Sequence, residues 1–377
     1  MIMESVVSAL NFDKSDWTLT KFGDVAIQQK ETVDRDDTHL SRYVKGEHMG
    51  SEDLHLREWG ELTDEYLGPA FIRKFDEGDI LYGSRRTYLR KVVVAPFSGI
   101  TSNTTFVIKA NVKKIDKRLL PFVMMSEGFT ENSIRNSKGS VNPYINWKDI
   151  ANYEFLLPPK DQQAKLAELL WAMDEVIEKE VKILYYLNDV QNAVMRKIKS
   201  QFFSKTESEQ EKPNVKHGRI DSFFKLQRGF DLTKKDSLEG KYPVISSSGI
   251  TYYHNNYKCE GPGVITGRKG KIGDVYYFNG PHWPHDTTLW VKDFCGNVPK
   301  FVYWFLKSIN LENYNAATAV PTLNRNTIHP VKVKFPNIEF QSMIADRLDA
   351  ISSCITNAES KVAKSKSLQK SLINQIF

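Results

Sequence analysis

The sequence predicts an α+β protein: two similar globular domains of mixed α and β structure, joined by two long antiparallel coiled-coil helices, with a pseudo-twofold internal repeat. Its 377 residues exceed what one hydrophobic core usually organises, so at least two domains are expected. A constant offset of 178 residues aligns positions 142–198 with 320–376 without a gap. Within both aligned segments, apolar residues recur at alternating steps of three and four, which is typical of coiled-coil helices.

The repeat is stronger than chance. The 57 aligned positions contain 11 identities, among them Pro143 with Pro321, Asn146 with Asn324, and Gln163 with Gln341. Average residue usage would give roughly three or four identities. We therefore interpret the repeat as real.

Each predicted helix follows a proline, Pro158 or Pro336, and runs for about 36 residues, or roughly 55 Å. A narrow apolar stripe needs a partner, and the nearest stripe of equal length is the other copy. Because the first helix leaves the first domain and the second ends the repeat, the two should run antiparallel. The predicted seam consists of Leu166, Leu170, Met173, Ile177, Leu184 and Leu187 in one helix and Ile344, Leu348, Ile351, Ile355, Val362 and Leu372 in the other. Gln191 and Gln369 interrupt it, either as register-setting residues or as glutamines tolerated at the surface.

Three segments upstream of each helix also correspond, with offsets that drift from 181 to 184. Residues 78–88 match 262–272, each an apolar strand that runs into a basic turn containing glycine. Residues 103–109 match 286–292 as buried strands, and residues 118–126 match 300–308 as core helices. The two domains should therefore share a fold while their loops differ.

The composition is that of a globular protein, with 41% hydrophobic and 26% charged residues. Three cysteines are too few for a disulfide framework or a four-cysteine zinc site. Acidic residues near the start argue against a signal peptide, and no apolar run approaches membrane-spanning length. We expect a cytoplasmic protein with no membrane partner.

Positive charge is distributed unequally along the chain. The formal net charge is +6. Residues 214–336 contain 17 Lys and Arg against 9 Asp and Glu, whereas residues 1–158 contain 21 against 23. The second region is therefore expected to bind a polyanion, and the first only through local basic patches.

The two basic turns, residues 83–86 and 267–271, are the strongest candidates for a binding site. Glycine lets the backbone approach a phosphate, and arginine can donate two parallel hydrogen bonds to phosphate or guanine. Each turn alone could be a solvated hairpin tip, but its recurrence in both copies favours binding. Tyr88, Tyr252, Tyr253, Trp283 and Trp290 could add stacking contacts, although most of them are expected in the core.

Other motifs do not support catalysis. Asn142, Pro143 and Tyr144 resemble part of an amino-methyltransferase signature but lack its second proline, so they are interpreted as a turn. Residues 267–273 lack the spacing of a nucleotide-binding P-loop. His282, His285 and Asp286 form a lone cluster without further spaced ligands. No catalytic residue, metal ligand or cofactor site is predicted in this chain.

With these features, the chain resembles the specificity subunits of type I restriction-modification systems. The resemblance rests on residues 261–277, 283–294, 300–306 and 319–328 and on the proline-led helices with Gln163 and Gln341. It implies target-recognition domains at 1–158 and 214–336, conserved helices at 159–203 and 337–377, and a linker at 204–213. In this family each domain reads half of an asymmetric bipartite DNA site, and the helices act as a ruler.

The resemblance also implies partners. Two methyltransferase (M) subunits, which carry S-adenosylmethionine, and restriction (R) motor-nuclease subunits would assemble with this chain on double-stranded DNA. The candidate DNA-binding residues are Ser84, Arg85, Arg86, Tyr88, Lys138, Ser140, Gly267, Arg268, Lys269, Lys271, His285, Thr287 and Thr318.

Two alternatives stay open. One is the specificity subunit of a type IIB-like restriction-modification system, whose partner both methylates and cuts. The other is a coiled-coil adaptor whose basic loops bind an acidic protein rather than DNA.

Overall fold

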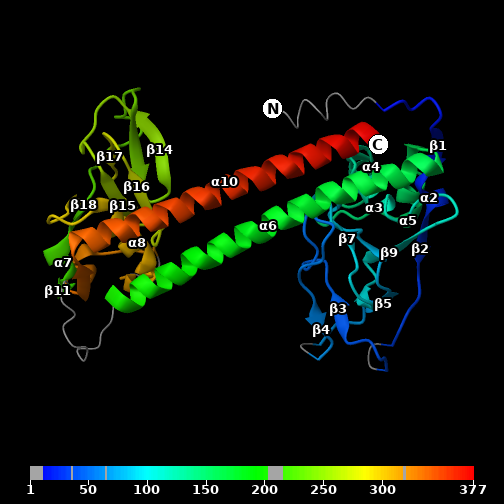
Figure 1. The fold of residues 1–377 in the computed structure, drawn as a ribbon, viewed down its shortest axis with the longest axis horizontal. Coiled ribbons are helices and arrows are strands. Elements are labelled where there is room, and N and C mark those ends of the chain that lie inside the picture. The colour runs from blue at the N-terminus through cyan, green and yellow to red at the C-terminus, as the bar shows by residue number, and fades with distance from the viewer. Residues whose placement is uncertain (1–11, 35–36, 64–65, 203–214, 317–319) are drawn as a thin grey trace. The chain divides into compact units, whose positions relative to one another are not determined.

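The computed structural model describes residues 12–34, 37–63, 66–202, 215–316 and 320–377 (Figure 1). The chain forms two compact units: unit 1 contains residues 1–181 and 360–377, and unit 2 contains residues 182–359. Each long helix contributes residues to both units. The predicted linker at 204–213 and the candidate residue Thr318 lie outside the described residues. The two units of mixed α and β structure confirm the α+β part of the predicted fold class, whereas the coiled-coil pairing, the pseudo-twofold repeat and the individual domain boundaries stay predictions.

Unit 1 contains two four-stranded sheets and a strand pair. The first sheet is antiparallel, in the order β2 (Ala26–Gln29), β9 (Thr105–Ala110), β6 (Ile80–Gly83) and β7 (Val92–Val94). The second has the order β4 (Gly60–Glu61), β3 (Arg42–Val44), β8 (Gly99–Ser102) and β5 (Phe71–Phe75), with β3 and β8 parallel. β1 (Thr18–Lys21) pairs with β10 (Glu154–Leu157), which leads to the first long helix.

Short helices pack against the first sheet of unit 1. They are α2 (Phe22–Val25), α3 (Leu120–Met125), α4 (Glu127–Arg135) and α5 (Trp147–Ala151). The first five residues of α3 are buried, as predicted for a core helix. A 3₁₀ turn, η1 (Thr87–Leu89), follows the basic turn after β6.

Unit 2 repeats this plan with local differences. Its main sheet has the antiparallel order β12 (Lys225–Arg228), β18 (Thr288–Asp293), β15 (Gly263–Gly267) and β16 (Val275–Phe278). A smaller sheet has the order β14 (Gly249–His254), β13 (Tyr242–Ser246) and β17 (Trp283–Pro284). β11 (Val215–Arg219) pairs with β19 (Lys332–Pro336) in front of the second long helix.

The helices of unit 2 are α7 (Ile220–Phe223), α8 (Pro299–Ser308) and α9 (Arg325–Ile328), with a 3₁₀ turn, η2 (Leu311–Tyr314). Phe301, Val302, Trp304, Phe305 and Leu306 of α8 lie in the core, which confirms the predicted core helix. The strands predicted at 262–272 and 286–292 are present as β15 and β18.

The two long helices are α6 (Lys160–Phe202) of 43 residues and α10 (Ile338–Ile376) of 39 residues. Both are longer than the predicted 36 residues. α6 starts directly after the proline pair and continues past Ile198, the last position of the apolar series. Within unit 1, Leu166 and Leu170 of α6 share a core with Leu372 and Ile376 of α10. Within unit 2, Ile198 of α6 shares a core with Ala345 and Leu348 of α10. In each unit, therefore, the start of one helix packs with the end of the other.

The predicted seam residues are not equally buried. Leu166, Leu170, Ile177, Leu348, Ile355 and Leu372 are buried, whereas Met173, Leu184, Leu187, Ile344, Ile351 and Val362 are half-buried. Gln369 points from α10 to α6 within unit 1: its amide nitrogen lies 3.5 Å from the Leu170 carbonyl oxygen and from Asp174 Oδ1. Gln369 is therefore part of the helix contact, in line with the register-setting interpretation, which stays a hypothesis.

Candidate nucleic-acid interface

The basic turn of unit 1 is held by backbone hydrogen bonds to two neighbouring segments. The Ser84 amide donates to the Thr104 carbonyl at 3.2 Å, and the Ser84 carbonyl accepts from Ile145 at 2.9 Å. The Arg86 amide donates to the Pro143 carbonyl at 2.6 Å. The turn after β6 is thereby fixed between the start of β9 and the segment before α5.

The basic turn of unit 2 has the same set of bonds. The Arg268 amide donates to the Thr287 carbonyl at 2.8 Å, and the Arg268 carbonyl accepts from Leu323 at 2.8 Å. The Gly270 amide donates to the Pro321 carbonyl at 3.0 Å. Ser84 thus corresponds to Arg268, and the acceptors are the prolines that align in the repeat.

This hydrogen bonding corrects the expectation that the turn backbone itself approaches a phosphate. The amides of Ser84, Arg86, Arg268, Lys269 and Gly270 already donate to protein carbonyls. These five amides are therefore not free to bind an anion, which leaves the exposed side chains as the main donors at both turns. Glycine serves packing instead, because a Cβ on Gly267 would lie 1.8 Å from the Lys271 carbonyl oxygen, and Gly270 has a φ of +86°.

The candidate residues of unit 1 gather around this turn. The backbones of Arg85 and Lys138 both form isolated β-bridges with Tyr144. The Arg86 side chain donates from Nε to Asn142 Oδ1 at 3.2 Å. Arg85, Arg86, Tyr88, Lys138 and Ser140 are exposed. Ser84 is buried, and its hydroxyl donates to the Thr104 carbonyl at 2.5 Å, so its role here is structural. Within the turn predicted at residues 142–144, Asn142 lies in a bend, Pro143 has no regular secondary structure and Tyr144 forms isolated β-bridges.

In unit 2, the structure brings Arg268, Lys269, Thr287 and His285 together. Lys269 is exposed, and Arg268 Nε donates to the Asp286 carbonyl at 2.9 Å. Both ring nitrogens of His285 are engaged, Nδ1 with Thr287 Oγ1 at 3.0 Å and Nε2 with the Leu232 carbonyl at 3.1 Å.

Two further candidates of unit 2 have other partners. Lys271, the last residue of the turn, is paired with Asp274 at 2.6 Å, and Gly267 is buried within β15. All candidate DNA contacts stay predictions.

The expectation that most of the singled-out aromatic residues are core is wrong. Of the five, only Trp283 is fully buried, whereas Tyr88 and Tyr253 are more than half exposed. Tyr252 and Trp290 are intermediate. Tyr253 alternates outward along β14, which is a half-exposed strand rather than a buried one.

Sequence reasoning missed two arginines beside the unit 2 turn. Arg228, at the end of β12, and Arg325, the first residue of α9, line an open recess together with Arg268. The offset of 178 residues pairs Arg325 with Trp147, so the repeat gave no signal for a shared charge there. Only the fold brings the three arginines together.

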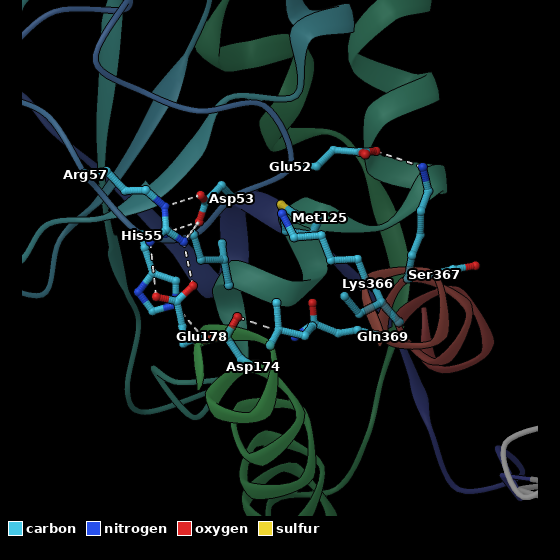
Figure 2. A pocket seen from close by; sticks show the side chains of 14 residues that line it. Glu52, Asp53, His55, Arg57, Met125, Asp174, Glu178, Lys366, Ser367 and Gln369 are labelled. Atoms are coloured by element: carbon cyan, nitrogen blue, oxygen red, sulfur yellow. Dashed lines mark hydrogen bonds and ion pairs between the residues drawn. The ribbon is translucent and has the colours of Figure 1, made fainter. Parts of the chain in front are cut away.

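A second polar cluster of unit 1 fixes the loop before β4 to the long helices (Figure 2). His55 Nε2 lies 2.7 Å from Asp174 Oδ2 on α6, and Arg57 bridges Asp53 and Glu178. The hydrogen bond to Asp174, which favours the charged imidazole, raises the pKa of His55 above its usual 6.5. These interactions tie the globular part of unit 1 to α6.

Within the described ranges, no three His, Cys, Asp or Glu side chains are arranged to hold a metal ion. His282 is buried, its Nδ1 lies 2.9 Å from the Gly280 carbonyl, and burial lowers its pKa. A membrane-spanning helix, long and apolar enough to cross a bilayer, is likewise absent from the described part of the chain.

The two α+β units, each with a basic turn, define the class of fold, and the comparisons with known proteins identify the family. The family described as the type I restriction modification DNA specificity domain matches residues 11–187 and 212–364. This chain belongs to that family. Its members are the non-catalytic DNA-recognition subunits of type I restriction systems.

The relatives differ in their identity to this chain and in how much of it they cover. The Escherichia coli EcoDI specificity subunit is 31% identical over 191 residues, which cover 48% of this chain but only 41% of that protein. The Methanocaldococcus jannaschii MjaVIII specificity subunit is 21% identical over 96% of this chain and 92% of its own. The crystal structure of the type I restriction-modification S subunit from M. genitalium has the same fold, with a TM-score of 0.64, 14% identity and 96% coverage of both chains.

Proposed function

We propose that this chain binds double-stranded DNA in a sequence-specific manner and that each unit recognises one half of an asymmetric bipartite site. The observation that carries the proposal is the shared set of backbone hydrogen bonds around two basic turns, one in each unit. The bonding is common to both, but the exposed side chains differ: Arg85 and Arg86 in one turn, Lys269 in the other. Similar scaffolds with different side chains would recognise different bases.

The pseudo-twofold repeat and the coiled-coil pairing of α6 and α10 belong to the same proposal. Support comes from glutamines at equivalent positions. Gln163 Nε2 donates to the Pro158 carbonyl and Gln341 Nε2 to the Pro336 carbonyl, each at 2.8 Å. The two helices would serve as the ruler that separates the half-sites.

The same helices would dock two methyltransferase (M) subunits and, through them, the restriction (R) subunits. The exposed apolar side chains of Ile183, Tyr185 and Tyr186 on α6 support this, because a helix face of this kind is stabilised by a partner. S-adenosylmethionine would be held by the methyltransferase partner and not by this chain.

Methylome sequencing of cells that express this chain with its cognate methyltransferase tests the proposal. We expect one methylated motif made of two short specific blocks separated by a nonspecific spacer. A continuous motif would contradict bipartite recognition. A methylome that is the same with and without this chain would contradict DNA recognition altogether.

A further inference from the structure

Three arginines from three elements of unit 2 converge on one open recess of about 630 Å³. Arg228 ends β12, Arg268 lies in the basic turn, and Arg325 begins α9. No carboxylate is among the described residues that line this recess. Its other lining residues are Gln227, Gly229, Phe230, Leu289, Thr322, Leu323 and Asn324.

Arg228 is paired with acids, whereas Arg268 and Arg325 have no acidic partner among the described residues. The Arg228 guanidinium donates to Asp231 at 2.7 Å and to Asp286 at 3.1 Å. Arg268 instead uses Nε to bond the Asp286 backbone carbonyl, and its two terminal nitrogens have no hydrogen bond to the described part of the chain. The guanidinium of Arg325 has no hydrogen bond or ion pair among the residues that the structure describes, and its side chain is exposed.

The scaffold does not require these charges. In unit 1 the position with the hydrogen bonds of Arg268 is Ser84, and the residue after the helix-capping asparagine is Trp147 rather than Arg325. Trp147 packs against Phe22 and Phe106, so unit 1 fills this position with an apolar side chain. Arg268 and Arg325 are therefore available for a ligand.

We propose that this recess, lined by Arg228, Arg268 and Arg325, binds a phosphate of the DNA backbone. The inference rests on the proposed DNA-binding function and deepens it. A guanine edge offers the two acceptors that a single arginine uses, and further arginines around it would lack a partner. A backbone phosphate carries one negative charge, and its oxygen atoms can accept hydrogen bonds from more than one guanidinium group.

The test measures binding of the full chain to short duplexes of unrelated sequence at several salt concentrations. The variants are Arg325→Gln, Arg268→Gln and the double variant. Lys292→Gln is the matched control, because Lys292 is exposed at the far end of β18 from the turn and its loss removes the same charge. Circular dichroism confirms that each variant is folded.

We expect the double variant to weaken binding to every duplex by the same factor and to lower the slope of log affinity against log salt by about 0.9, the value for one phosphate of B-DNA. Arg325→Gln alone should give a part of both effects, and it serves as the test if the Arg268 variants do not fold. The Lys292→Gln control should keep the wild-type slope.

Three results would overturn the proposal. These are an unchanged slope in Arg325→Gln and the double variant, a loss confined to one duplex sequence, and an equal loss in the Lys292→Gln control. The first refutes the phosphate contact, the second indicates a base contact, and the third indicates general electrostatics. Failure of the wild-type chain to bind any duplex would instead refute the proposed function together with the recess.

Discussion

Single buried side chains explain how the globular parts attach to the helices. Gln341 is almost fully buried near the start of α10. It accepts a hydrogen bond from the Val298 amide at 2.9 Å and donates to Asn297 Oδ1 at 2.7 Å and to the Pro336 carbonyl at 2.8 Å. The loop before α8, the end of β19 and the helix are thus joined by one amide.

Replacement of this residue, Gln341→Leu, should lower the free energy of unfolding by roughly 2–4 kcal/mol, since each buried polar group left without a partner costs about 1–3 kcal/mol. Urea denaturation of the purified full chain measures the change. Gln201→Leu, on an exposed face of α6, is the control and should stay within about 0.5 kcal/mol of wild type. Equal effects in both variants would mean that the hydrogen bonds of Gln341 contribute nothing specific.

The sequence showed part of this. It identified Gln163 and Gln341 as identities in the repeat, but not their distant partners, which lie 43 to 49 residues away in segments whose course only the fold defines. The same is true of the Arg228, Arg268 and Arg325 recess, which joins residues that are 40 to 97 positions apart.

His55 should make the stability of unit 1 depend on pH. The pKa of His55 is raised above 6.5 chiefly by its hydrogen bond to Asp174, with further support from Glu178 and Asp53, while burial opposes the shift. A raised pKa in the folded state means that the stabilisation is fully present below 6.5 and is lost as pH rises through the folded-state value.

We therefore expect His55→Gln to lower the melting temperature more at about pH 6 than at about pH 8.5. Thermal unfolding of both proteins at the two pH values is the measurement. Asp174→Asn should reduce the pH dependence in the same way, because it removes the carboxylate that stabilises the imidazolium. A difference between wild type and His55→Gln that is independent of pH would refute this account.

At the scale of elements, long periodic segments were predicted better than short ones. The alternating steps of three and four residues predicted both long helices, yet they underestimated α6 by seven residues, because its ends carry polar residues that the apolar series does not include. Strands such as β4, with two residues, and β3, with three, are too short to give an alternating pattern and are defined by their partners in the sheet.

The apolar residues on α6 should matter for assembly and not for folding. Ile183 is 55% exposed and Tyr186 is 70% exposed, and they lie three residues apart on one side of the helix. The double variant Ile183→Asp, Tyr186→Asp should leave the melting temperature nearly unchanged, as expected of exposed positions. It should weaken copurification with the methyltransferase subunit at least about tenfold, because exposed tyrosines are frequent hot spots of interfaces.

Quantitative pull-down with the cognate methyltransferase measures this effect. Lys182→Asp introduces the same acidic side chain next to this surface and should have a smaller effect. If copurification with the double variant equals that of wild type, the methyltransferase binds elsewhere on the chain.

At the scale of the whole chain, the two units share a hydrogen-bonding pattern but differ in charge. This difference suggests that they contribute differently to DNA binding. Residues 214–336 carry a clear excess of basic residues, whereas residues 1–158 are slightly acidic. Sequence-independent attraction to DNA should therefore come mainly from unit 2. Recognition of bases in both half-sites, in contrast, would require exposed side chains in each unit.

Arg85 and Lys269 test this division, because they occupy equivalent places in the two units. Arg85 forms an isolated β-bridge with Tyr144 and Lys269 forms one with Thr322, and Tyr144 and Thr322 align in the repeat. Both side chains are exposed, so alanine should not disturb the core. Methylome sequencing with Arg85→Ala should show relaxed sequence in one block of the split motif, and Lys269→Ala in the other. A lost base contact costs about 1–3 kcal/mol, which corresponds to roughly 5-fold to 150-fold less discrimination at that position. If both variants relax the same block, the two units do not read separate half-sites. If neither variant changes the motif, these two side chains do not read bases.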